Sequence, residues 1–275
     1  MATFRRNTAQ GSAERFDPRP RDRATATPSL AVAQEIVRAR RFGVLYRPVI
    51  EATTGETVGW RPAVRLVTAD GRRVAARELF RVLHARPRLL LHAEMEIKRF
   101  VLEHAPKGGP LYLRVDADAA APAGEDFADV FRALLKTHRA EQAVVEVTEN
   151  RPAVDTHRLH RLICHLSAHD LAVAASGFAV VRALPPDLLG GLDCAILGAD
   201  ELGGFRDARR LAEIGRVIDA VTAGGGRTLL AGVRWPEDLA LARYLGFSAV
   251  SGLCFDHEAV LQVWEESYVL ARATR

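Results

Sequence analysis

The segment Val144–Glu149 carries the side chains of this chain that are best suited to chemistry. Its sequence, VVEVTE, holds the carboxylates Glu146 and Glu149, with Thr148 between them. β-Branched residues favour strands, and a nearly continuous apolar run suits a parallel strand that is buried on both faces. A carboxylate inside such a run is costly unless a metal ion, a cation or hydrogen bonds meet it. We therefore expect Glu146 to have a partner from elsewhere in the chain.

The elements around this segment alternate between strands and helices. The expected strands are Val44–Ile50, Val58–Leu66, Leu111–Val115, Val144–Thr148, Leu171–Ala175, Cys194–Leu197, Thr228–Ala231 and Ala249–Leu253. The expected helices are Leu30–Arg40, Ala76–Leu83, Leu90–His104, Asp126–His138, Thr156–Ala168, Pro186–Leu189, Arg206–Ala223, Glu237–Leu245 and Glu258–Ala271.

The alternation predicts an α/β fold. The turn signal Thr54-Gly55-Glu56 is so short that the first two strands must be antiparallel. The later strands should be parallel, with right-handed crossovers. Eight strands in about 220 residues predict a closed (β/α)8 barrel. An open doubly wound sheet is the alternative, but no glycine-rich nucleotide turn follows the first strand.

Composition limits the domain plan and the classes of function. Residues 1–28 mix Arg, Asp, Pro, Ala and Thr without periodicity, which predicts a disordered tail before a single domain over residues 29–275. The net charge of +4 comes mostly from dispersed arginines, so we expect no nucleic-acid partner. No long apolar run indicates a membrane segment. Three widely separated cysteines, Cys164, Cys194 and Cys254, fit a reduced, cytoplasmic protein.

Five short segments form an ordered series along the chain. They are Tyr46-Arg47-Pro48-Val49, Gly55 through Trp60, Glu146-Val147-Thr148-Glu149, Gly232-Val233, and Gly246 through Phe255. In order and spacing, this series resembles the EAL-domain family, the cyclic-di-GMP phosphodiesterases, from about Leu30 to Val263. The third segment matches the family's Glu-x-Thr-Glu. The resemblance implies a (β/α)8 barrel of the EAL type.

The resemblance also implies that most of the family's metal-binding groups are replaced. Active members hold one or two divalent ions through carboxylates and an amide, and these ions activate the attacking water. Here the signature Glu-Ala-Leu is Arg61-Pro62-Ala63, and the metal-binding Asn corresponds to Asp116. Positions that hold the paired aspartates, the lysine, the general-base glutamate and the glutamine in the family are Ser176, Gly177, Ile196, Ala231 and Ser251. We therefore expect no metal, no cofactor and no catalysis.

Arg61 offers a partner for Glu146. In the family, the glutamates at these two positions share a metal ion, so they lie close together. An arginine at one of them would put a fixed cation where the ion was. We predict that the planar guanidinium of Arg61 pairs with Glu146 or Asp116.

Three further arginines, Arg47, Arg65 and Arg234, could form an anion-binding surface at the barrel mouth. The resemblance aligns Arg65 with an arginine that contacts a phosphate of the dinucleotide. Alternatively, these arginines pair with Asp116, Glu146 and Glu149 and bind no ligand. The two possibilities separate two functions: a signalling adaptor that binds a protein partner, which we favour, and a receptor that binds cyclic-di-GMP without cutting it. A homodimer is also compatible with the sequence.

Two other motifs resemble ligand sites. Gly224-Gly225-Gly226-Arg227 follows a predicted helix and precedes a strand, which is the reverse of a phosphate loop, so we interpret it as a helix C-terminal turn. His157, His160, Cys164, His165 and His169 have spacings that can bind zinc. Because the leucines of the same helix define its buried side, we expect the histidines to face solvent.

Overall fold

The computed structural model describes residues 27–255, except 122, 125, 139, 141, 150–154 and 203–206, together with the strand Leu261–Trp264. The predicted disordered tail over residues 1–28 lies outside the described residues, apart from its last two. None of the helices in the described part of the chain has the length and apolar character that crossing a membrane requires.

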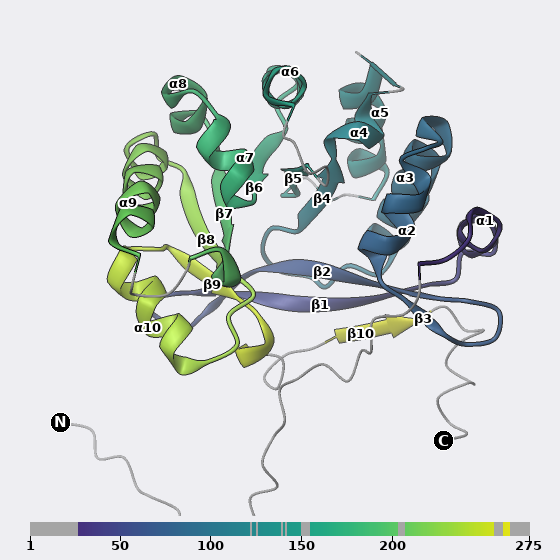
Figure 1. The fold of residues 1–275 in the computed structure, drawn as a ribbon, viewed down its shortest axis with the longest axis horizontal. Helices are drawn as coiled ribbons and strands as arrows, with labels where there is room; N and C mark the ends of the chain where they lie inside the picture. Colours follow the sequence, from purple (N-terminus) through teal and green to yellow (C-terminus); the bar gives the residue numbers. More distant parts are fainter. Residues whose placement is uncertain are drawn as a thin grey trace, which may run out of the picture.

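A curled sheet forms the centre of the fold (Figure 1). Its strand order is β3-β2-β1-β9-β8-β7-β6-β5-β4, and β10 pairs with β1 off this path. The pairs from β9 to β4 are parallel, whereas β1 is antiparallel to β2, β9 and β10. The strands are β1 Phe42–Glu51, β2 Thr57–Val67, β3 Arg73–Val74, β4 Tyr112–Asp116, β5 Val144–Thr148, β6 Ala172–Ser176, β7 Cys194–Gly198, β8 Arg227–Ala231, β9 Ala249–Ser251 and β10 Leu261–Trp264.

Helices pack along the outside of the curled sheet, and they follow the strands in the expected alternation (Figure 1). The helices are α1 Leu30–Arg38, α2 Ala76–Leu83, α3 Pro87–Glu103, α4 Ala117–Ala120, α5 Asp126–Thr137, α6 Thr156–Ala168, α7 Phe178–Ala183, α8 Pro186–Gly190, α9 Ala208–Ala223 and α10 Pro236–Leu245, with 3-10 turns η1 Ala199–Glu201 and η3 Leu253–Phe255. The predicted α/β barrel with an antiparallel first strand pair is confirmed.

The two ends of the sheet meet at a narrow seam between β2 and the residues before β4. Trp60 and Leu111 form an isolated parallel bridge there, and the amide of Trp60 donates to the carbonyl of Pro110 over 2.8 Å. The indole of Trp60 also donates to the carbonyl of Gly108, at 2.9 Å. A Cβ at Gly59 would lie 2.8 Å from the carbonyl oxygen of Pro110, so this approach depends on glycine.

Strand β5 shows how the sheet separates two apolar layers. Val145 and Val147 belong to the larger core, between the sheet and the helices. Val144 faces the other way, into a small cluster that fills the barrel and includes Tyr112 and Cys194. Because side chains alternate along a strand, Glu146 lies on the same face as Val144, one step nearer the carboxyl end. The fold therefore places this carboxylate directly above the apolar filling of the barrel.

The predicted final helix, Glu258–Ala271, is wrong where the structure describes it. Leu261–Trp264 forms β10, and Tyr46 pairs with Leu261. Strand β9 pairs with β1 only at Ile50 and Glu51. The other backbone N–H and C=O groups on that edge of β1 need hydrogen-bond partners, and pairing with β10 outweighs the local helical preference of this segment. The sequence also failed to predict the short elements β3, α4 and α7.

The seam can be tested with Gly59→Ala. The added methyl would meet the Pro110 carbonyl, so we expect the free energy of unfolding to fall by about 1–3 kcal/mol. Urea denaturation measures this. Gly215→Ala is the matched control, because a Cβ in that helical position meets nothing within 4 Å. It should stabilise the chain by roughly 0.5–1 kcal/mol. Equal stability of the two variants would contradict the described seam.

Candidate functional site

Glu146 is buried and bonded to two arginines. Only 1% of the surface of Glu146 is exposed to solvent. The Nε of Arg61 donates to Oε2 over 3.2 Å, and the Nη2 of Arg61 donates to Oε1 over 2.6 Å. Arg114 adds two donations to Oε1, at 3.2 Å from Nε and 3.1 Å from Nη2. The predicted pairing of Arg61 with Glu146 is confirmed, and it is bidentate.

Two features of the fold bring these groups together. Arg114 and Glu146 are register partners in the parallel ladder between β4 and β5, so their side chains lie side by side on one face. Arg61 comes from the opposite end of the sheet, and it follows Trp60, the residue that forms the seam with Leu111. Closure of the barrel therefore brings the guanidinium of Arg61 next to the carboxylate of Glu146.

The electrostatics of the site keep Glu146 ionised. Burial by itself would raise the pKa of this carboxyl group, but the charges of Arg61 and Arg114, with hydrogen bonds from Arg61 and Ser176, lower the pKa to about 2. The same charge of Glu146 raises the pKa of Arg114. Burial raises the pKa of the Cys194 thiol, deeper in the barrel, to about 12. The site is therefore a fixed ion cluster above a neutral floor.

A cavity of about 330 Å³ opens above this cluster, at the carboxyl ends of the strands. Most of the positions that the sequence singled out line it: Arg61, Glu149, Ser176, Gly177, Ile196 and Ala231. Arg114, Asp200 and Glu201 line it as well. Six of the nine positions that the resemblance aligns with the family's active site therefore lie around one cavity, and Glu146 is bonded to one of them, Arg61. Ser251 is buried in β9 and is not among the lining residues.

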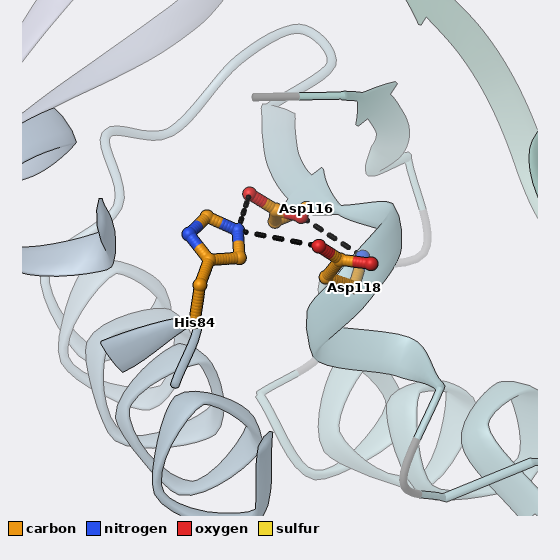
Figure 2. Close-up of side chains that lie close together, drawn as sticks. All are labelled: His84, Asp116 and Asp118. Carbon is orange, nitrogen blue, oxygen red and sulfur yellow. Dashed lines mark hydrogen bonds and ion pairs between the residues drawn. The ribbon is translucent and has the colours of Figure 1, made fainter. Parts of the chain in front are cut away.

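Asp116 takes part in a second polar cluster. Its Oδ2 lies 3.1 Å from Nε2 of His84, and its Oδ1 accepts from the amide of Asp118 over 2.9 Å. We call His84, Asp116 and Asp118 the His84 cluster; Figure 2 shows their side chains pointing toward one another. The guanidinium of Arg158 bonds to Asp118 from outside it. No pattern in the sequence indicates His84, Asp118 or Arg158, because their side chains come from separate elements.

The three candidate anion-binding arginines are not among the residues that line the cavity. Arg47 is the register partner of Arg61 on β1, and Arg65 stands further along β2, opposite Gly43. Arg234 is exposed before α10, where its amide donates to Asp238 over 2.8 Å. Among the described residues that line the cavity, the arginines are instead Arg61 and Arg114. Only the register of β4 against β5 reveals Arg114, so the sequence did not single it out.

The structure agrees with the interpretation of the glycine motif, and with that of the histidine motif for its first half. Helix α9 ends at Ala223, and Gly225 adopts a φ of +86° in the turn that follows. On α6, His157, His160 and Cys164 are exposed, whereas His165 and His169 are half-buried, the latter at the C-cap of the helix. The leucines at 159, 162 and 166 form the buried side of that helix, together with Ile163.

Comparison with known proteins agrees with the geometry. Residues 30–257 match the model of the EAL domain, so the chain belongs to the EAL domain family, a family of cyclic-di-GMP signalling whose members are usually phosphodiesterases. No curated protein matches the chain.

Solved structures of EAL domains share the fold. An EAL domain protein from Listeria monocytogenes EGD-e has a TM-score of 0.64 at 17% identity and covers 91% of this chain and 99% of its own. The FimX EAL domain from Pseudomonas aeruginosa, bound to c-di-GMP, has a TM-score of 0.64 at 15% identity, with coverages of 84% and 95%. The Xanthomonas citri FimX EAL domain, in complex with c-diGMP, has a TM-score of 0.62 at 14% identity, with coverages of 81% and 89%.

The ion cluster predicts a pH dependence of stability. The pKa of Glu146 is about 2 in the folded chain and about 4.3 when a glutamate is unfolded, so its ionisation stabilises the fold above pH 4.3. This stabilisation, roughly 3 kcal/mol at pH 7, is lost as the pH falls through 4.3 toward 2. Urea denaturation of the native chain and of Glu146→Gln measures it. The stability difference should shrink by roughly 1 kcal/mol between pH 7 and pH 3.5. A difference that grows on acidification would contradict this assignment.

Proposed function

We propose that this chain is a non-hydrolysing EAL domain that acts as an adaptor, through protein–protein contacts, in bacterial signalling. One observation carries the proposal: the guanidinium of Arg61 is bonded to both oxygens of Glu146. By the family resemblance, both positions would hold metal-binding carboxylates. A fixed cation that uses both oxygens competes directly with a divalent ion for this carboxylate.

The other positions around the mouth support the absence of hydrolysis. Ser176, Gly177, Ile196 and Ala231 line the cavity where the resemblance places acidic groups, a lysine and a general base. None of these four side chains can act as a general base near neutral pH or neutralise a developing phosphate charge.

The charge of the cavity favours the adaptor over a nucleotide receptor. Its two arginines are already bonded to Glu146, whereas Glu149, Asp200 and Glu201 add carboxylates to the lining. The carboxylate of Glu201 accepts from the amides of Gly198, at 2.7 Å, and Phe178, at 3.0 Å. A ligand with two phosphodiester charges would lie close to these carboxylates, which would oppose its binding.

The exposed surface offers groups that suit a protein partner. Trp235 at the start of α10 and Tyr244 within it are 49% and 76% exposed. Aromatic side chains of this kind are enriched in protein interfaces. We propose the exposed surface around α10 as the first to test, within one domain over residues 29–275 in a cytoplasmic protein. A homodimer would be a second use of such a surface.

A receptor for cyclic-di-GMP is the second candidate. Arg61 and Arg114 line the cavity, and arginine is well suited to phosphate recognition. The two FimX EAL domains with similar folds were solved with this dinucleotide bound. If the chain were a receptor, Arg114→Ala would weaken binding, because Arg114 lines the cavity and 57% of its side chain is accessible.

Measurements of cyclic-di-GMP binding and of its hydrolysis test the adaptor and the receptor hypotheses together. We expect the full chain, with Mg²⁺ or Mn²⁺ present, to show no hydrolysis above blank and a Kd weaker than about 100 µM by isothermal titration. The Pseudomonas aeruginosa FimX EAL domain serves as the positive control for binding. Micromolar binding that Arg114→Ala abolishes would favour the receptor instead. Metal-dependent turnover would contradict the loss of hydrolysis.

The adaptor role has its own test. A protein captured by the full chain from its host should bind the purified chain saturably, and Trp235→Ala combined with Tyr244→Ala should weaken this binding at least tenfold, since interface aromatics often dominate affinity. Val130→Ala, which removes an exposed apolar side chain from α5, is the matched control and should bind normally. If no captured protein binds saturably, the adaptor role is contradicted.

A further inference from the structure

The His84 cluster lies outside the cavity and has the form of a metal site. We propose that Nε2 of His84, Oδ2 of Asp116 and Oδ2 of Asp118 bind one divalent transition-metal ion. The cluster joins two separate parts of the fold, because His84 is the C-cap of α2 while Asp116 ends β4 and Asp118 lies in α4. A bound ion would tie these elements together.

The separations of the three ligand atoms suit a metal ion. All three atoms lie within 4.8 Å of one another. The Nε2 of His84 is 3.1 Å from Oδ2 of Asp116 and 3.6 Å from Oδ2 of Asp118 (Figure 2). Metal bonds of about 2.0–2.2 Å to imidazole nitrogen and carboxylate oxygen place neighbouring ligands roughly 3.0–3.6 Å apart. The two separations from Nε2 of His84 to the aspartate oxygens therefore match the spacing of ligands around one ion.

Hydrogen bonding by His84 explains only part of this arrangement. A protonated Nε2 has one N–H, and the 3.1 Å separation from Asp116 suits it. The 3.6 Å separation from Asp118 exceeds the length of a hydrogen bond. Both carboxylates nonetheless direct Oδ2 at the same nitrogen, which a shared ion would account for.

Outer groups orient both carboxylates, as is usual around metal ligands. The Oδ1 of Asp116 accepts from the amide of Asp118, and the Oδ1 of Asp118 accepts from Arg158. The amide of Asp116 donates to Glu94 over 3.0 Å, and Glu94 in turn bonds to Lys98. In each aspartate, Oδ1 accepts a supporting hydrogen bond and Oδ2 lies near Nε2 of His84.

Burial of the two aspartates strengthens their attraction to a cation, and the cluster is still accessible to solvent. Asp116 and Asp118 are 2% and 5% exposed, and buried carboxylates gain most from a cation nearby. The imidazole of His84 keeps 18% of its side chain accessible, so solvent reaches one side of the cluster. One imidazole and two carboxylates favour Mn²⁺, Fe²⁺ or Zn²⁺ over Mg²⁺ and Ca²⁺, which prefer oxygen alone.

This site shares only Asp116 with the metal-binding positions of the family, and it is independent of the proposed function. Neither His84 nor Asp118 is among the positions that the resemblance connects with metal, and Glu146 takes no part in the cluster. The proposal departs from the sequence expectation of no metal. It holds or fails whether or not the chain binds a protein partner.

Titration of the metal-free full chain with Mn²⁺ and with Zn²⁺ tests the site. Isothermal titration should show one equivalent bound at micromolar Kd or tighter, with weaker binding of Mg²⁺. His84→Ala and Asp118→Asn should each weaken the affinity at least tenfold. His160→Ala, which removes an exposed imidazole from α6, is the matched control and should bind as the native chain does.

A second measurement covers the case in which a variant does not fold. Co²⁺ bound to the native chain should show visible absorption bands, and the ring ¹⁵N signals of one histidine should shift on addition of Zn²⁺. Metal should also raise the melting temperature of the native chain, and not that of folded His84→Ala. Failure of the native chain to bind at millimolar metal, or undiminished binding by His84→Ala, would overturn the proposal.

Discussion

A carboxylate buried at position 146 has to be matched by positive charge, and much of the structure follows from that constraint. Desolvation would otherwise protonate it or unfold the strand that carries it. The chain supplies Arg114 from the neighbouring strand and Arg61 from the far end of the sheet. Since Arg61 reaches Glu146 only when β2 meets the start of β4, the ion cluster and the closure of the barrel depend on each other.

This cluster also divides the carboxyl ends of the strands into two regions with different chemistry. At Glu146, guanidinium groups take up the carboxylate oxygens, and the neighbouring lining residues Ser176, Ile196 and Ala231 carry no charge. Beside it, Asp116 turns toward His84 and Asp118, where three ligand-type atoms converge. The family fold is retained, and the family resemblance implies that the charges at its mouth are rearranged. On this basis we propose a role in binding and not in phosphodiester hydrolysis.

The sequence predicted the features that depend on local pattern or on a single pairing. Glu146 could be recognised because a carboxylate in an apolar strand needs a partner, and Arg61 because the family resemblance placed it nearby. Arg114 was missed, because its role depends on the register of β4 against β5. His84, Asp118 and Arg158 were missed for a similar reason, since α2, α4 and α6 meet only in the folded chain. The sequence predicts a helix where β10 forms, because the strand that pairs with β10 is β1, which lies far away in the sequence.

The central claim is that an arginine stands in place of a metal ion at Glu146. A crystal structure of the chain grown with Mn²⁺, with anomalous data collected near the manganese edge, tests this most directly. The account predicts no anomalous peak within bonding distance of Glu146 and a guanidinium from Arg61 on both of its oxygens. A manganese peak between Glu146 and Glu149, with Arg61 turned away, would contradict it.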